Sequence, residues 1–187
     1  MPTATDLARR LARLPAAAPV RAALGDAPRV HVVGGAVRDL LLGGAPDDLD
    51  LVVEGDAAAV ARRLAQACGP DAQLQLHDRF GTATVRAGGR AYDVVRARAE
   101  TYPRPGALPE VRPGTLAEDL ARRDFTVNAI ALSLDGRLAA VAHALDDLAA
   151  RWLRVLHDAS FRDDPTRLLR LVRYATRLGF AVEPRTA

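Results

Sequence analysis

Two aspartates one residue apart, Asp48 and Asp50, are the side chains in this sequence best placed to do chemistry. They begin an apolar run that continues through Val53, which predicts a β-strand with a buried back. Side chains two residues apart on a strand point to the same face, so the two carboxylates would repel each other unless a cation lay between them. Carboxylate oxygens favour a divalent cation such as Mg²⁺. The spacing therefore predicts a metal site at Asp48 and Asp50.

A paired glycine, Gly34-Gly35, follows a short apolar run, and twelve residues separate it from Asp48. A Gly-Gly turn that opens a helix offers free backbone N–H groups to a phosphate, and Arg38 adds a planar positive group. Alternatively, Arg38 is an ordinary cation on the surface of a helix. Carboxylates that bind a metal, together with a phosphate cradle, indicate a site for nucleotidyl transfer.

This layout resembles the catalytic head of the polymerase-β-like nucleotidyltransferases, whose signature is Gly-Gly, a short helix and Asp-x-Asp. Three later segments narrow the resemblance to the bacterial-type (class II) tRNA nucleotidyltransferase and poly(A) polymerase family. They are EDLARRDFTVNAIAL at Glu118–Leu132, DDLAARWLRVL at Asp146–Leu156 and RDDPTRLLRLVRYATRLGF at Arg162–Phe180. The motifs stand in the family's order and cover most of residues 30–180. The resemblance implies an α+β fold, in which a head with a small mixed sheet and helices is followed by a helical neck.

The activity implied by the resemblance is template-independent addition of C, A or both to the 3′ end of tRNA. The substrates would be CTP and ATP, and pyrophosphate would be released. Asp48 and Asp50 would bind two Mg²⁺ ions, one that activates the primer 3′-hydroxyl and one that holds the triphosphate. CCA-adding, CC-adding and A-adding enzymes and poly(A) polymerases share these motifs, so the sequence leaves the choice among them open.

Alternatives from other functional classes also remain open. One is a head that binds nucleotide or RNA without catalysis, although the intact Asp48 and Asp50 argue against it. Another is transfer of a nucleotide to a protein or a small molecule, which would not need the base-reading residues described below.

A third carboxylate usually completes such sites from a neighbouring strand. Asp93 is the first candidate, because Tyr92 and Val94 on either side of it would face the opposite side of a strand over residues 90–97. Glu100 is the second candidate. Asp93 could instead be an ordinary carboxylate on an edge strand.

The resemblance also assigns roles in nucleotide binding. It places Gly34, Gly35 and Arg38 against the triphosphate. In RRDFTVNA, it implies that Arg123, Asp124 and Asn128 bind the ribose hydroxyls, which would favour NTP over dNTP. Alternatively, Asp124 only caps the helical turn that follows it.

A protein-side template for the base is implied by DDPTRLLR at residues 163–170. On a helix expected over residues 163–178, Asp164 and Arg167 would share one face. The carboxylate would accept from the exocyclic amine of cytosine or adenine and the arginine would donate to a ring nitrogen, whereas guanine and uracil present a carbonyl instead. Arg170 either contacts phosphate or is an ordinary solvated side chain. The alternative for Asp164 and Arg167 is an ordinary surface ion pair.

The organisation expected from these patterns is a catalytic head over residues 1–142 and the start of a helical neck over 143–187. Thr5 is expected to cap the first helix and Asp56 the fourth. Four prolines and two glycines predict a loop over residues 101–114. The other expected elements are helices at 5–14, 18–24, 35–43, 56–68, 115–123 and 143–150, and strands at 29–33, 48–54, 73–77, 81–87, 129–134 and 138–141.

Composition sets the remaining expectations. The chain has 187 residues, of which 49% are hydrophobic, so it can bury a core. The net charge is only +3 and every basic residue is arginine, which we ascribe to codon bias. The single cysteine, Cys68, and the lack of a long apolar run predict a cytoplasmic protein without a membrane span. No obligate protein partner is evident, and the scattered histidines do not predict zinc. Because the family continues into a helical body and tail, we expect a part of a longer protein.

Overall fold

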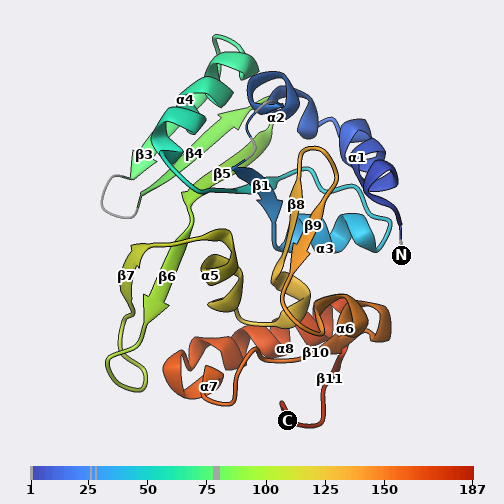
Figure 1. Cartoon of the computed structure of the whole chain (residues 1–187), viewed down its shortest axis with the longest axis vertical. Coiled ribbons are helices and arrows are strands. Elements are labelled where there is room, and N and C mark those ends of the chain that lie inside the picture. The colour runs from blue at the N-terminus through green and yellow to red at the C-terminus, as the bar shows by residue number, and fades with distance from the viewer. Residues whose placement is uncertain (1, 26, 28, 78–80) are drawn as a thin grey trace. The chain divides into compact units, whose positions relative to one another are not determined.

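The structure is a computed structural model that describes residues 2–25, 27, 29–77 and 81–187. It has the expected α+β composition and divides into two compact units (Figure 1). Unit 1 contains the residues up to Ala97 and Ala131–Ala139, and unit 2 contains Arg98–Ile130 and Ala140–Ala187. The chain thus leaves unit 1 and returns to it. This division differs from the expected head and neck boundary after residue 142, which stays a prediction.

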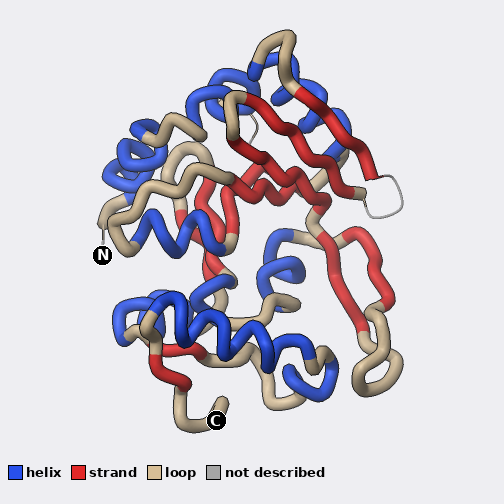
Figure 2. Tube along the Cα trace, turned by 180° about the vertical axis from the view of Figure 1, so that it is seen from behind, coloured by secondary structure: helices blue, strands red, loops and turns tan. Residues whose placement is uncertain are grey.

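Unit 1 is organised around a mixed sheet. Within the described ranges the sheet has seven strands in the order β3-β4-β5-β2-β1-β8-β9, drawn in red in Figure 2. Strands β2 and β5 pair in parallel, whereas β1 pairs with both β2 and β8 antiparallel, as β4 does with β3 and β5. The strands are β1 Val30–Val33, β2 Leu49–Val53, β3 Gln73–His77, β4 Thr82–Ala87, β5 Arg90–Arg96, β8 Ile130–Ser133 and β9 Leu138–Ala140.

Strand β2 lies in the interior of this sheet and is almost entirely buried. Of its five residues only Asp50 is exposed, and the other four are apolar side chains of the core. A strand with apolar residues on both faces is held firmly in the middle of a sheet. The fold therefore fixes Asp50 on a rigid element.

The helices of unit 1 are α1 Ala4–Arg13, α2 Ala17–Leu24, α3 Gly35–Leu41 and α4 Ala57–Cys68. Helix α1 begins with a capping box between Thr3 and Asp6, so the expectation that Thr5 is the cap was wrong. Asp56 caps α4 as expected, because its side chain accepts from the Ala59 N–H at 3.0 Å. Helix α4 packs on α2 and on β4 (Figure 1).

Unit 2 combines short helices with two small ribbons. Its helices are α5 Leu116–Ala121, the 3₁₀ helix η2 Thr126–Asn128, α6 Ala144–Ala150, α7 Ser160–Asp163 and α8 Thr166–Leu178. Strands β6 (Arg98–Thr101) and β7 (Glu110–Pro113) form one antiparallel ribbon, and β10 (Trp152–Leu153) and β11 (Ala181–Val182) form a parallel one. No helix in the described ranges has both the length and the apolar character needed to cross a membrane.

Two expectations for unit 2 were wrong: the loop over residues 101–114 and the continuous helix over residues 163–178. The loop expected over residues 101–114 contains β7, because Pro113 sits at the end of a two-stranded ribbon, where a missing N–H is tolerated. The helix expected over 163–178 is broken between α7 and α8, as Figure 2 shows. Asp164 has extended backbone angles (φ −133°, ψ 94°), since a residue that precedes proline is driven out of the helical region. Asp164 therefore does not share a helix with Arg167.

Candidate active site

Two of the three predicted catalytic carboxylates lie on paired strands of unit 1, and the third lies just before one of these strands. Asp50 of β2 is the direct partner of Asp93 of β5 in their parallel pairing. Asp48 lies two residues before Asp50, and its Oδ1 accepts the Ala91 N–H at 2.8 Å, which ties it to the start of β5. All three side chains are exposed. The structure therefore brings Asp48, Asp50 and Asp93 together.

The alternative that Asp93 is an edge-strand carboxylate was wrong, because β5 lies between β4 and β2. Sequence reasoning missed its hydrogen-bond partner, Thr84, whose hydroxyl donates to Asp93 Oδ1 at 2.7 Å. The signal was available: in a hairpin that turns at Gly88-Gly89, Ala87 pairs with Arg90, and counting back places Thr84 opposite Asp93.

Glu100, the second candidate for the third carboxylate, belongs to β6 of unit 2 and is nearly buried. Its Oε1 lies 2.9 Å from Arg98 Nη2 and 3.1 Å from Arg122 Nη1. The side chain thus already neutralises two guanidinium groups, which leaves Asp93 as the better candidate.

The chemistry of the acidic residues suits a hard divalent cation, since the donors are carboxylate oxygens. Asp48 and Asp93 each have Oδ1 bonded to a protein donor. Over the described part of the chain, however, no three His, Cys, Asp or Glu side chains are gathered closely enough to hold a metal ion. The residues thus fit a divalent cation by donor type, and the structure does not define its coordination.

The Gly-Gly turn and Arg38 form the start of helix α3. Gly34 precedes the helix with φ 68°, a left-handed conformation that glycine adopts without strain. Arg38 is buried, with only 1% of its surface exposed, so the alternative of a surface cation was wrong. Its Nε and Nη2 lie 2.8 and 2.7 Å from Asp39 Oδ1. A Cβ on Gly35 would stand 3.4 Å from Arg38 Nη2, so the glycine also gives the guanidinium its room.

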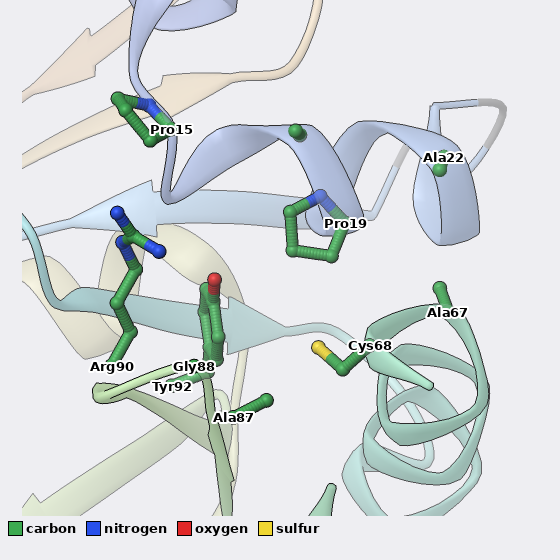
Figure 3. A pocket seen from close by; sticks show the side chains of 10 residues that line it. Pro15, Pro19, Ala22, Ala67, Cys68, Ala87, Gly88, Arg90 and Tyr92 are labelled. Carbon is green, nitrogen blue, oxygen red and sulfur yellow. The ribbon is translucent and has the colours of Figure 1, made fainter. Parts of the chain in front are cut away.

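Two hollows open in unit 1 near the acidic residues. One, of about 410 Å³, is lined by Asp48, Asp71 and the arginines Arg86 and Arg90. The other, of about 430 Å³, is shown in Figure 3 and is lined mainly by alanine and proline, with Arg90, Tyr92 and Cys68. Burial raises the pKa of both Tyr92 and Cys68, which keeps the phenol and the thiol neutral at pH 7. Of these two hollows, only the first has carboxylates in its lining; they are Asp48 and Asp71, and neither Asp50 nor Asp93 is among them.

In unit 2, Asp124 joins residues of two separate motifs. Its Oδ1 accepts from the Phe125 N–H at 2.8 Å and from Asn128 Nδ2 at 3.0 Å. Its Oδ2 accepts from Arg170 Nε at 2.7 Å. The structure therefore brings Asp124, Asn128 and Arg170 together. Asp124 does not cap η2, since Phe125 holds the N-cap position without a side-chain bond.

Arg170 is half-buried and remains charged. Burial acts to lower its pKa, but the Asp124 carboxylate outweighs this effect, so the pKa of Arg170 is raised. Its Nη2 donates to the Tyr174 hydroxyl at 3.0 Å. Tyr174 also packs edge-on against Phe125, with ring centroids 5.9 Å apart. Helix α8 is thus tied to the RRDFTVNA segment through Arg170 and Tyr174.

Arg123, the remaining predicted ribose contact, is held by a carboxylate that sequence reasoning missed. Asp119 is fully buried, and its Oδ2 lies 2.9 Å from Arg123 Nη2 while its Oδ1 lies 2.6 Å from Arg122 Nη2. Arg123 Nη1 also donates to the Asn128 carbonyl at 3.3 Å. The signal in the sequence was the spacing, because Asp119 precedes the two arginines by three and four residues on a helix.

The predicted template residues are adjacent, but not as a surface ion pair. Arg167 is 4% exposed, and its Nε lies 3.8 Å from Asp164 Oδ2. Arg167 Nη1 donates to Ser160 Oγ at 2.6 Å and Nη2 to the Arg122 carbonyl at 2.9 Å. The Tyr102 hydroxyl also lies near: burial and Glu100 raise its pKa, and the charge of Arg167 opposes that rise.

Comparison with known proteins agrees with this arrangement. Residues 30–154 match the family described as the poly(A) polymerase head domain. An A-adding tRNA nucleotidyltransferase of Halalkalibacterium halodurans is 47% identical over 163 residues, which cover 84% of this chain and 38% of that protein. A CC-adding tRNA nucleotidyltransferase of Deinococcus radiodurans is 48% identical over 159 residues, which cover 82% of this chain and 42% of that protein.

A solved structure of a tRNA nucleotidyltransferase, complexed with a primer tRNA and an incoming ATP analog, has a similar fold. It matches with a TM-score of 0.75 at 40% identity and covers 90% of this chain and 47% of that one. This chain spans about two fifths of the length of the two curated relatives. The family match covers two thirds of the chain, including the acidic residues, the Gly-Gly turn and RRDFTVNA. The chain therefore belongs to the family of poly(A) polymerase head domains.

Proposed function

We propose that this chain carries the nucleotide-transferring part of a tRNA nucleotidyltransferase, which adds C, A or both to the 3′ end of tRNA from CTP and ATP. The observation that carries the proposal is the direct pairing of Asp50 with Asp93, with Asp48 tied to the same strand. The register of two strands fixes Asp50 opposite Asp93, with Asp48 bonded to β5 beside them. Negative charge held on rigid elements in this way supports a role in transfer of a phosphoryl group.

The metal in this proposal is Mg²⁺, held by Asp48 and Asp50. A bound divalent cation would supply charge neutralisation for the triphosphate and favour ionisation of the attacking hydroxyl. Asp93 would complete the carboxylate group, and Gly34, Gly35 and Arg38 would contact the triphosphate. Asp39 positions Arg38, since it accepts from two nitrogens of that guanidinium.

Recognition of the sugar and the base is assigned to unit 2. Arg123, Asp124 and Asn128 are the proposed ribose contacts, and Arg170 pairs with the Asp124 carboxylate at 2.7 Å. Asp164 would accept from the exocyclic amine of cytosine or adenine, and Arg167 would donate to the ring nitrogen beside it. The proposed substrates are therefore CTP and ATP in preference to UTP and GTP, with a cytoplasmic location supported by the single unpaired cysteine.

The test uses this 187-residue chain with Mg²⁺ and labelled CTP or ATP. Each nucleotide is offered to tRNAs that end at the discriminator base, at C or at CC. Incorporation that is abolished in Asp48→Ala and retained in Asp47→Ala would support the proposal, because Asp47 is an exposed neighbour with no assigned role. The accepted primer would distinguish CCA-, CC- and A-adding activity.

A second candidate, poly(A) polymerase activity on other RNA 3′ ends, follows from the description of the matched family. An unstructured RNA primer with ATP, included in the same assay, separates the two activities. A chain that binds CTP and ATP but incorporates neither, even when joined to the further domains of a full-length relative, would favour the non-catalytic alternative.

A further inference from the structure

Each of the two template residues is held in place by a hydroxyl group from unit 2. Ser160, the first residue of α7, is fully buried and accepts from Arg167 Nη1 at 2.6 Å. Thr166, the first residue of α8, donates from Oγ1 to Asp164 Oδ1 at 2.6 Å. The two hydroxyls therefore lie on either side of the break between α7 and α8 that Pro165 causes.

The contacts of Arg167 fix the plane of its guanidinium. Ser160 Oγ accepts at one terminal nitrogen, and the Arg122 carbonyl accepts at the other at 2.9 Å. A planar group held at both ends cannot rotate about its Nε–Cζ axis without breaking one bond. A guanidinium has five N–H donors, so these two bonds leave others for a ligand.

The contacts of Asp164 fix which of its oxygens faces Arg167. Oδ1 accepts from both the Thr166 N–H at 3.0 Å and the Thr166 hydroxyl. Oδ2 is left on the side of Arg167, 3.8 Å from Nε. Asp164 Oδ2 is thus a hydrogen-bond acceptor next to the N–H donors of Arg167. Cytosine and adenine carry the complementary pair, an amine that donates next to an unprotonated ring nitrogen that accepts.

We propose that Ser160 and Thr166 are positioning residues that determine base selectivity, by keeping Arg167 and Asp164 in this order. The proposal rests on the base-reading role of Asp164 and Arg167 given above. Uracil and guanine present a carbonyl beside a protonated ring nitrogen, the reverse of the pattern in cytosine and adenine. If the Arg167 guanidinium or the Asp164 carboxylate could turn, it could also form hydrogen bonds with uracil or guanine. Side chains that are held in place cannot reorient in this way, so they reject these two bases.

The two hydroxyls differ in importance. Ser160 Oγ accepts from Arg167 Nη1 at 2.6 Å, and both residues are buried. Asp164 keeps the backbone N–H of Thr166 when the hydroxyl is removed. Ser160→Ala should therefore relax selectivity more than Thr166→Val, and Thr166→Ser, which retains the hydroxyl, should behave like the wild type.

The experiment measures the dissociation constants of CTP, ATP, UTP and GTP for the 187-residue chain by isothermal titration calorimetry, without primer. Loss of one buried hydrogen bond in Ser160→Ala should lower the preference for CTP and ATP over UTP and GTP by about fivefold to tenfold. Thr166→Val should lower it by about twofold to threefold. The matched control is Ser133→Ala, which removes a buried hydroxyl of unit 1 that bonds the Arg137 carbonyl.

The outcomes separate this inference from the proposed function. A wild-type chain that binds all four nucleotides alike would contradict the template itself. A selective wild type with an equally selective Ser160→Ala would overturn the positioning role of Ser160. Destabilisation alone would weaken binding of all four nucleotides together and leave their ratio unchanged. If Ser160→Ala does not fold, Ser160→Cys keeps the side-chain shape with a weaker acceptor, and it should show the same loss of selectivity.

Discussion

Asp50 and Asp93 are direct cross-strand partners in the parallel pairing of β2 and β5, so one carboxylate stands opposite another. Like charges placed opposite each other destabilise a sheet by about 0.2–1 kcal/mol. We therefore expect Asp93→Asn to raise the free energy of unfolding by about that amount in metal-free buffer while it abolishes nucleotide transfer. Urea denaturation with EDTA, followed by the transfer assay, measures both effects. A variant that is active, or less stable than the wild type, would contradict the assignment of Asp93.

Thr84 is expected to support catalysis through Asp93, because its hydroxyl fixes Asp93 Oδ1 at 2.7 Å. Thr84→Val should lower the rate of transfer by about tenfold and raise the Mg²⁺ concentration needed for half-maximal rate, since a hydrogen bond to a charged group is worth about 1.5 kcal/mol. The control is Thr82→Val on the same strand, where the cross-strand partner is Val95. Equal rates and Mg²⁺ dependence in the two variants would show that the hydroxyl has no such role.

The two glycines before α3 should respond differently to alanine. Gly34→Ala forces a side chain into a left-handed conformation (φ 68°) and should cost about 1–2 kcal/mol of stability. Gly35→Ala places a Cβ 3.4 Å from Arg38 Nη2, so it should weaken ATP binding with a smaller loss of stability. Thermal denaturation and ATP titration of both variants test this contrast, and it would be disproved if Gly35→Ala bound ATP as tightly as the wild type.

Asp119 is a buried carboxylate between Arg122 and Arg123. Asp119→Asn would remove the carboxylate that pairs with Arg123 and would leave Arg122 with Glu100 as its counter-charge. We expect the free energy of unfolding to fall by about 3 kcal/mol. Urea denaturation followed by far-UV circular dichroism provides the measurement. Glu118→Gln is the neighbouring control. Glu118 is more exposed and takes part in the capping box of α5, so this substitution should lower the free energy of unfolding by less. A similar loss in both variants would mean that burial of Asp119 contributes nothing.

His31 should make stability depend on pH. Burial lowers its pKa from 6.5, Arg137 adds to this, Glu54 and Asp135 oppose it, and Nδ1 has no partner among the described residues. Because the unfolded chain takes up the proton first, the stability contributed by neutral His31 is present above about pH 6.5 and is lost as the pH falls below it. Denaturation at about pH 7.5 and 5.5 should therefore show a smaller decrease for His31→Gln than for the wild type. If stability decreased equally in the wild type and in His31→Gln, His31 would not be the cause of the pH dependence.

Much of unit 1 could be predicted from the sequence because its site depends on local geometry. The period of two along a strand predicts that Asp48 and Asp50 share a face, and the Gly88-Gly89 hairpin sets the position of Asp93. Gly34-Gly35 predicts the start of α3. These relationships hold between residues that are close in sequence or joined by a tight turn, so pattern and spacing are sufficient.

The contacts that orient the site were harder to predict because they join distant segments. Arg170 reaches Asp124 across 46 positions, and Arg167 reaches the Arg122 carbonyl across 45. The spacing of residues along the sequence does not predict contacts between segments so far apart. The break at Asp164 is different, since a residue before proline is disfavoured in a helix and the sequence alone predicts it. The helical periodicity of LLRLVRYATRL applies only within α8, which begins at Thr166.

The return of the chain to unit 1 has a consequence for how the protein is made. Strand β1 is synthesised about a hundred residues before β8, its partner on one side. Until residues 130–133 leave the ribosome, β1 has an unpaired edge, which can pair with other chains. Pairing across such a long sequence separation is also slow to form. We therefore expect the nascent head to complete its sheet late and to need protection from aggregation until β8 is in place.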